Sequence, residues 1–188
     1  THPISRENFL KFVRIYRAKT GLETPKKITA LAIDLYGREY KKAIELDPKN
    51  FHAFNNRGTA KKESGDVDGA IADLNRAIEI NDKFVLAYCN RSSSKQTKGD
   101  LDGALADCKR AIELDPACAL AYVNRGLIKG KKGDLDGSVA DCNRAIELDS
   151  SLSSAHQGLS QALIHAGDLG QAVAVGRRGV ELGPSDAD

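Results

Sequence analysis

Histidine and cysteine side chains are the groups of this 188-residue chain best suited to catalysis or metal binding. The four histidines are His2, His52, His156 and His165. None has a nucleophile or carboxylate at a recognisable spacing, and no glycine-rich loop suited to a phosphate is present. The cysteines form neither a C-x-x-C pair nor a zinc-finger pattern. The sequence therefore predicts no enzyme activity, no cofactor and no metal site.

The four cysteines are Cys89, Cys108, Cys118 and Cys142. Two of them, Cys108 and Cys142, are 34 residues apart, at a place where a small apolar side chain packs well. We predict buried free thiols rather than a disulfide or a metal role. Free thiols favour a reducing compartment, so the expected location is the cytoplasm, with a periplasmic or organellar one left open.

Polar residues that could bind a ligand recur along the chain. Asparagine followed by arginine recurs at Asn56-Arg57, Asn90-Arg91 and Asn124-Arg125, and each step is 34 residues. A Gly-Asp pair and a later aspartate follow each copy at the same offsets. A fixed period of this length is the signature of a repeat architecture.

The elements that must position these residues follow from the same period. In each copy a helix ends at the Gly of the Gly-Asp pair, and the Asp begins a second helix by accepting free backbone N–H groups. The predicted units are a divergent N-terminal helical hairpin, three regular repeats and a degenerate C-terminal repeat: residues 1–50, 51–84, 85–118, 119–152 and 153–186. We expect the first hairpin to be a cap.

The pattern resembles the tetratricopeptide repeat family. Phe54, Tyr88 and Tyr122 supply the aromatic residue at position 4, and Pro116 and Pro184 supply the late proline. The resemblance implies an all-α, right-handed superhelical solenoid of antiparallel helix pairs. It also implies a concave groove, lined by the first helix of each repeat, that binds a peptide or protein segment.

The arginines depart from the usual leucine of the family at position 7. They occur together with an aspartate at position 23, and in the fourth copy Leu159 and Val175 replace both. We therefore predict structural ion pairs between the two helices of a repeat, in preference to a ligand-binding role. The pairs are Arg57–Asp73, Arg91–Asp107 and Arg125–Asp141.

The asparagines at position 6 are the main candidates for ligand contact. An amide carries a donor and an acceptor, so Asn56, Asn90 and Asn124 could form a row along an extended peptide. The alternatives are that they hydrogen-bond within the scaffold or are copies of a recent duplication. Helical geometry adds further candidates on the same stripe: His52, Asn55, Thr59, Leu86, Ser93, Leu120, Val123 and Leu127. The cationic residues of a chaperone-tail clamp are missing, so we do not predict that ligand.

Two further expectations concern partners. The formal charge is +2, and the basic excess lies within residues 1–50. The basic, aromatic helix expected over residues 5–20 is interpreted as part of the cap, in preference to a membrane or nucleic-acid contact. The alternative function is a structural module that self-associates through its end surfaces into a homo-oligomer, through Val173, Val180 and Leu182.

Overall fold

The computed structural model describes residues 37–182, which are helical except for short turns. A helix covers residues 37–46. Eight further helices follow: α3 (Phe51–Glu63), α4 (Val67–Ile80), α5 (Val85–Lys98), α6 (Leu101–Leu114), α7 (Ala119–Lys131), α8 (Leu135–Leu148), α9 (Ser153–Ala166) and α10 (Leu169–Leu182). The part of the chain so described contains no strand. The predictions for residues 1–36, including the basic helix and the start of the cap, and for residues 183–188 fall outside it.

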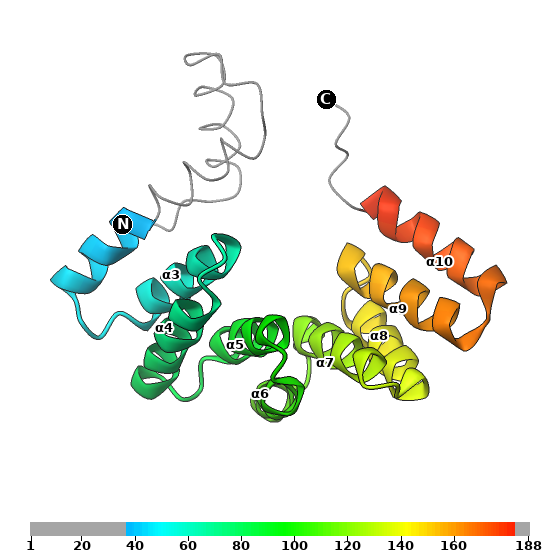
Figure 1. Ribbon diagram of the computed structural model, residues 1–188, viewed down its shortest axis with the longest axis horizontal. Coiled ribbons are helices and arrows are strands. Elements are labelled where there is room, and N and C mark those ends of the chain that lie inside the picture. Colours follow the sequence, from blue (N-terminus) through cyan, green and yellow to red (C-terminus); the bar gives the residue numbers. More distant parts are fainter. Residues whose placement is uncertain (1–36, 183–188) are drawn as a thin grey trace, which may run out of the picture.

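Consecutive helices form antiparallel hairpins, and each hairpin falls within one predicted repeat (Figure 1). The turn inside each hairpin has a glycine with positive φ, between +86° and +92°, at Gly65, Gly99, Gly133 and Gly167. A residue with a Cβ would be strained there. The next residue begins the second helix; for example, the Asp66 carboxylate accepts a hydrogen bond from the Gly69 N–H at 2.9 Å. The Gly-Asp pair thus has the predicted role.

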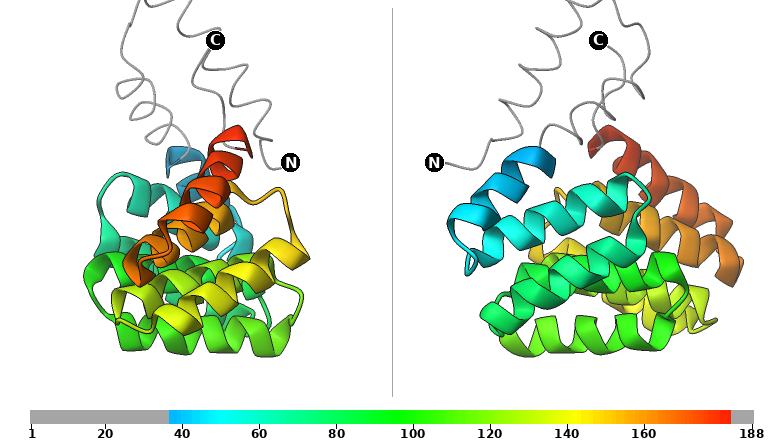
Figure 2. Two further views of the ribbon diagram at one scale, coloured as in Figure 1. Left: turned by 90° about the vertical axis from the view of Figure 1, so that its right-hand side faces the viewer. Right: turned by 60° about the vertical axis from the view of Figure 1, so that its left-hand side comes forward.

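The hairpins stack side by side into a curved row (Figures 1 and 2). The first helices contact one another in sequence: α3 contacts α5, α5 contacts α7, and α7 contacts α9. Among the labelled helices, the second helices α4, α6, α8 and α10 make no such contacts with one another. Closer spacing of the first helices bends the row toward them, so α3, α5, α7 and α9 line its concave side.

Small residues bring the two helices of a hairpin close together. The tightest crossing joins position 8 of the first helix to position 24 in the second. A Cβ added to Gly58 would lie 2.9 Å from Leu74 Cγ, and one added to Gly126 would lie 2.9 Å from Cys142 Sγ. The four pairs are Gly58 with Leu74, Ser92 with Cys108, Gly126 with Cys142, and Ser160 with Gly176. Position 8 is therefore glycine or serine in all four repeats.

None of the helices between residues 37 and 182 is both long and apolar enough to cross a membrane.

Candidate functional site

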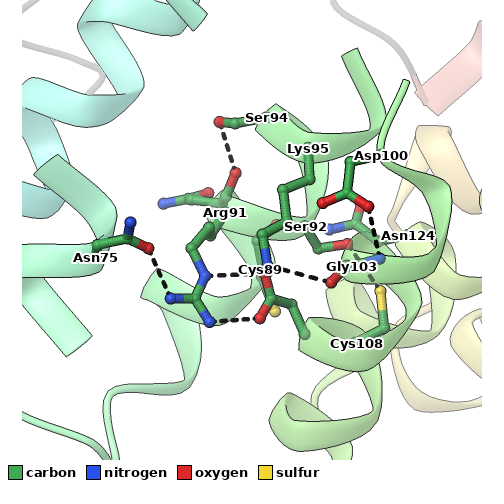
Figure 3. Close-up of polar contacts among 12 residues, drawn as sticks. Asn75, Cys89, Arg91, Ser92, Ser94, Lys95, Asp100, Gly103, Cys108 and Asn124 are labelled. Atoms are coloured by element: carbon green, nitrogen blue, oxygen red, sulfur yellow. Dashed lines mark hydrogen bonds and ion pairs between the residues drawn. The ribbon is translucent and has the colours of Figure 1, made fainter. Parts of the chain in front are cut away.

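The three arginine–aspartate pairs predicted from the sequence form two-pronged contacts between the helices of each hairpin. Arg57 Nε and Nη2 donate to Asp73 Oδ2 and Oδ1 at 2.7 and 2.6 Å. Arg91 binds Asp107 in the same way at 2.9 and 2.5 Å, and Arg125 binds Asp141 at 2.8 and 2.6 Å. Arg91 also donates to Asn75 Oδ1 of the preceding repeat at 2.8 Å (Figure 3).

A lysine completes each ionic group, and sequence reasoning missed it. Lys61, Lys95 and Lys129 each place Nζ 2.9 Å from an Oδ2 of the same aspartates. A usable signal was present, because these lysines recur every 34 residues and the fourth copy has Leu163 in their place. We call each set an ionic triad: Arg57–Lys61–Asp73, Arg91–Lys95–Asp107 and Arg125–Lys129–Asp141.

The arginines of the triads are committed to the scaffold. The carbon Cζ of Arg57 lies 5.5 Å from the ring centre of Phe54, and equivalent contacts join Arg91 to Tyr88 and Arg125 to Tyr122. The aspartates are 3–5% exposed. Each buried carboxylate is paired with two cations, and the guanidinium of the pair is also held over an aromatic ring. These arginines therefore make structural contacts and are not free charges for a ligand.

The fourth repeat fills the same space with apolar side chains. Leu159, Leu163 and Val175 take the places of Arg, Lys and Asp, and they pack with Cys142 and Ala172. The same positions between the two helices of a repeat are thus ionic in three repeats and apolar in the fourth.

The ionic triads make the stability of the folded state depend on pH. Burial alone would raise the pKa of Asp73 and Asp141, but hydrogen bonds from Arg57 and Lys61, and from Arg125 and Lys129, outweigh it and lower both pKa values. A lowered folded-state pKa adds stability that is fully present above the ordinary carboxyl pKa of about 4. That stability is lost as pH falls through the folded-state pKa.

We therefore expect the free energy of unfolding to fall on acidification below about pH 4. The variant Asp73→Asn/Asp141→Asn should show a shallower fall, because its amides cannot take up these protons. Urea denaturation between pH 5 and pH 2 measures both slopes. Asp82→Asn, at an exposed position, is the control and should keep the wild-type slope. Equal slopes for all three proteins would contradict the assignment.

The residues predicted to line the groove divide into those that are exposed or partly exposed and those that are buried. On the concave helices, Leu86 is 43% exposed and His52 is also exposed. The partly exposed members are Asn56, Thr59, Asn90, Ser93, Leu120, Asn124 and Leu127. Of these, Ser93 already accepts a hydrogen bond from Lys62 of the preceding repeat at 2.5 Å.

The sequence prediction is wrong for Asn55 and Val123, which are 2% and 1% exposed. Both occupy position 5, which faces the first helix of the next repeat instead of the open side. Cys89 at the same position is fully buried. Val123 packs with Ala145 and Ala155 from the following elements. The sequence prediction placed the positions on an isolated helix and did not include the first helix of the next repeat. It therefore overestimated the width of the exposed surface.

The asparagines at position 6 are each engaged at one end of the amide. Asn124 Nδ2 donates to the Cys89 carbonyl at 3.0 Å, and Asn90 Nδ2 donates to Asn55 Oδ1 at 2.9 Å (Figure 3 shows the first contact). Asn55 Nδ2 in turn donates to Asn56 Oδ1 at 3.1 Å. Within residues 37–182, no hydrogen bond reaches Oδ1 of Asn90 or Asn124. These two oxygens are available as acceptors on the concave side.

The repeated hairpins, their 34-residue period and their curvature define a helical-repeat solenoid. Tetratricopeptide repeat family models match residues 39–72 and 89–153. The chain belongs to the tetratricopeptide repeat family. This family generally mediates protein–protein interaction, and its repeats are non-catalytic scaffolds. No group of three or more histidine, cysteine or acidic side chains suited to a metal is present within the described residues.

Solved structures with the same fold cover most of the chain. The crystal structure of MamA is 25% identical, with a TM-score of 0.65, and the match covers 84% of this chain and 92% of that one. TTC0263, a thermophilic TPR protein of Thermus thermophilus, is 20% identical with a TM-score of 0.74, over 97% and 93% of the two chains. YrrB, described as a TPR protein with an unusual peptide-binding site, is 16% identical with a TM-score of 0.58, over 97% and 88%. No curated protein sequence matches.

Proposed function

We propose that the protein is an interaction scaffold that binds an extended peptide or protein segment along its concave side. The observation that carries this proposal is the pair of unengaged acceptors, Asn90 Oδ1 and Asn124 Oδ1, at equivalent places in successive repeats. YrrB, which shares the fold, is described as having a peptide-binding site, and this supports a peptide as the kind of ligand.

The hydrogen bonds inside the scaffold define what the ligand must supply. One N–H of each Nδ2 group of Asn90 and Asn124 is already used, so Oδ1 is the end of these amides that makes no hydrogen bond within the scaffold. Asn56 differs, because its Oδ1 is occupied and its Nδ2 is left. The ligand therefore offers N–H groups to the second and third repeats and an acceptor to the first. The backbone of an extended peptide carries both kinds of group.

Apolar contact has to add to these hydrogen bonds. A net hydrogen bond contributes about 0.5–1.5 kcal/mol, which two or three asparagines cannot raise to tight binding after the entropy of association. Leu86, Leu120 and Leu127 lie on the same helices as Asn90 and Asn124 and are exposed or partly exposed. A peptide with apolar side chains beside its bonded N–H groups fits this surface best.

Selection from a random peptide library on the wild-type chain, followed by titration of the selected peptides, tests the proposal. The variant Asn90→Ala/Asn124→Ala should bind these peptides roughly tenfold more weakly, since two hydrogen bonds are lost. Asn143→Ala removes an exposed asparagine of α8 and is the matched control. Unchanged affinity in the double variant, with helix content kept, would rule out the acceptor row.

Self-association is a second candidate, favoured by the exposed apolar stripe of α10. Leu169, Val173 and Val180 are 64%, 57% and 76% exposed and lie at helical spacing on one side. Sedimentation velocity over a range of concentrations tests it. A dimer that Val180→Glu abolishes supports assembly through this helix, and a monomer at all concentrations excludes it.

A further inference from the structure

Two cysteines meet at the junction between α5 and α7. Cys89 Sγ lies 3.8 Å from Cys118 Sγ, although the residues are 29 apart in the sequence. Cys89 is fully buried inside α5, whereas Cys118 is the residue from which α7 begins and is only partly buried. The sequence prediction of four buried thiols therefore holds for three, and Cys118 is the exception.

The surroundings of the two sulfurs differ in what they favour. A hydrogen bond from the Cys89 thiol lowers the pKa of Cys118, and the same contact raises that of Cys89. Cys118 makes no cap hydrogen bond of ordinary geometry, yet the N–H groups of Ala121 and Leu120 at the start of α7 also favour its thiolate. Partial burial and the Asp115 carboxylate act against the Cys118 thiolate, but they do not reverse the lowering of its pKa.

The other two cysteines are held in an unreactive form. Burial raises the pKa of Cys108 and of Cys142 to about 11. Cys108 Sγ contacts Ser92 Oγ at 2.9 Å inside its own hairpin (Figure 3), and Cys142 belongs to the apolar cluster of the fourth repeat. Reactivity toward oxidants follows thiolate character and exposure, so Cys118 is distinguished from both.

We propose that Cys118 is a site of oxidation by hydroperoxides, with Cys89 as its resolving partner in a disulfide between α5 and the residue that begins α7. The Cys118 thiolate attacks a peroxide oxygen, the O–O bond breaks, and hydroxide takes up a proton to leave as water. Cys118 is then a sulfenic acid. Cys89 loses its proton and attacks Cys118 Sγ, the S–O bond breaks, and a second water leaves. Two thiols and one H₂O₂ thus give one disulfide and two waters.

Geometry permits the second step with a local movement. A disulfide needs a sulfur separation of about 2.05 Å, so the present gap must close by less than 2 Å. Cys118 follows the short turn after α6, where a side-chain rotation and a small backbone shift disturb no helix interior. The bond would fix α5 against the start of α7. That junction also carries the hydrogen bond from Asn124 to the Cys89 carbonyl, so oxidation acts next to the concave surface.

Tryptic mapping of the oxidised full-length chain tests this inference, because trypsin places each cysteine in a different peptide. These peptides are residues 84–91, 99–109, 111–125 and 133–144. After reduction, treatment with one equivalent of H₂O₂ and blocking of the remaining thiols, we expect peptides 84–91 and 111–125 to be linked and released by dithiothreitol. Cys108→Ser and Cys142→Ser are matched controls and should form the same link.

Two variants separate the steps. In Cys89→Ser the resolving thiol is gone, so dimedone should trap a sulfenic acid on Cys118. In Cys118→Ser no link should form, and oxidation of Cys89 should fall at least about tenfold because its thiol is buried. Oxidation of Cys108 or Cys142 at the rate of Cys118 would overturn the proposal. So would a wild-type chain that accumulates unlinked sulfenic acid, or one linked only between molecules at high dilution.

Discussion

Asp141→Val alone is expected to lower the free energy of unfolding by about 2–3 kcal/mol, because it leaves two cations without their buried partner. The figure is below the roughly 3–5 kcal/mol of a fully buried pair, since Arg125 is 27% exposed and can turn toward water. The triple change Arg125→Leu/Lys129→Leu/Asp141→Val should recover most of this loss. It copies the apolar solution that the fourth repeat already uses.

Urea denaturation of the single, triple and wild-type chains measures the effect. The reverse experiment is the control: Leu159→Arg alone should destabilise the fourth repeat, because Val175 offers the guanidinium no carboxylate. A triple variant as unstable as Asp141→Val would show that the ionic triad is not interchangeable with the apolar cluster.

Leu74→Ala is expected to cost about 3 kcal/mol. Leu74 is the largest fully buried side chain among the described residues, and it fills the space left by the missing side chain of Gly58. Truncation opens a cavity at the tightest crossing of the first regular hairpin, where α3 and α4 are already held close by Ala70 and Ala77. Thermal and urea unfolding, monitored by circular dichroism, measure the loss.

A double-mutant cycle checks the cause of that cost. Gly58→Ser alone should be destabilising, since its Cβ would lie 2.9 Å from Leu74 Cγ. Adding Leu74→Cys reproduces the Ser92–Cys108 pair of the next repeat, so the double variant should be more stable than the sum of the single losses predicts. Additive losses would mean that the side chains at positions 58 and 74 do not constrain each other's size.

Contacts inside one repeat could be predicted from the sequence. The 34-residue period locates the hairpins, and joint loss of arginine and aspartate in the fourth copy predicts their pairing. Both inferences need only the geometry of a single hairpin. Lys61 and its equivalents were open to the same reasoning, because they recur and disappear with the same aspartates.

Contacts between one hairpin and the next could not be predicted in this way. Three features depend on how one hairpin is rotated against the next. They are the burial of Asn55 and Val123, the hydrogen bonds donated by the amides of Asn90 and Asn124, and the approach of Cys89 to Cys118. The sequence period contains no measure of that rotation. The candidate groove is therefore narrower, and richer in acceptors, than a stripe of exposed positions on isolated helices suggests.

The neighbour-only contacts of the helices have a consequence for how the chain reaches this structure. Each labelled helix contacts only helices one or two places along the sequence. Loops that must close before such contacts form are short, so their entropic cost is small. Folding rates rise as the mean sequence separation of contacts falls, and in such an array any hairpin can nucleate and recruit the next. Rapid folding from several starting points follows from the same one-dimensional arrangement that extends the concave side.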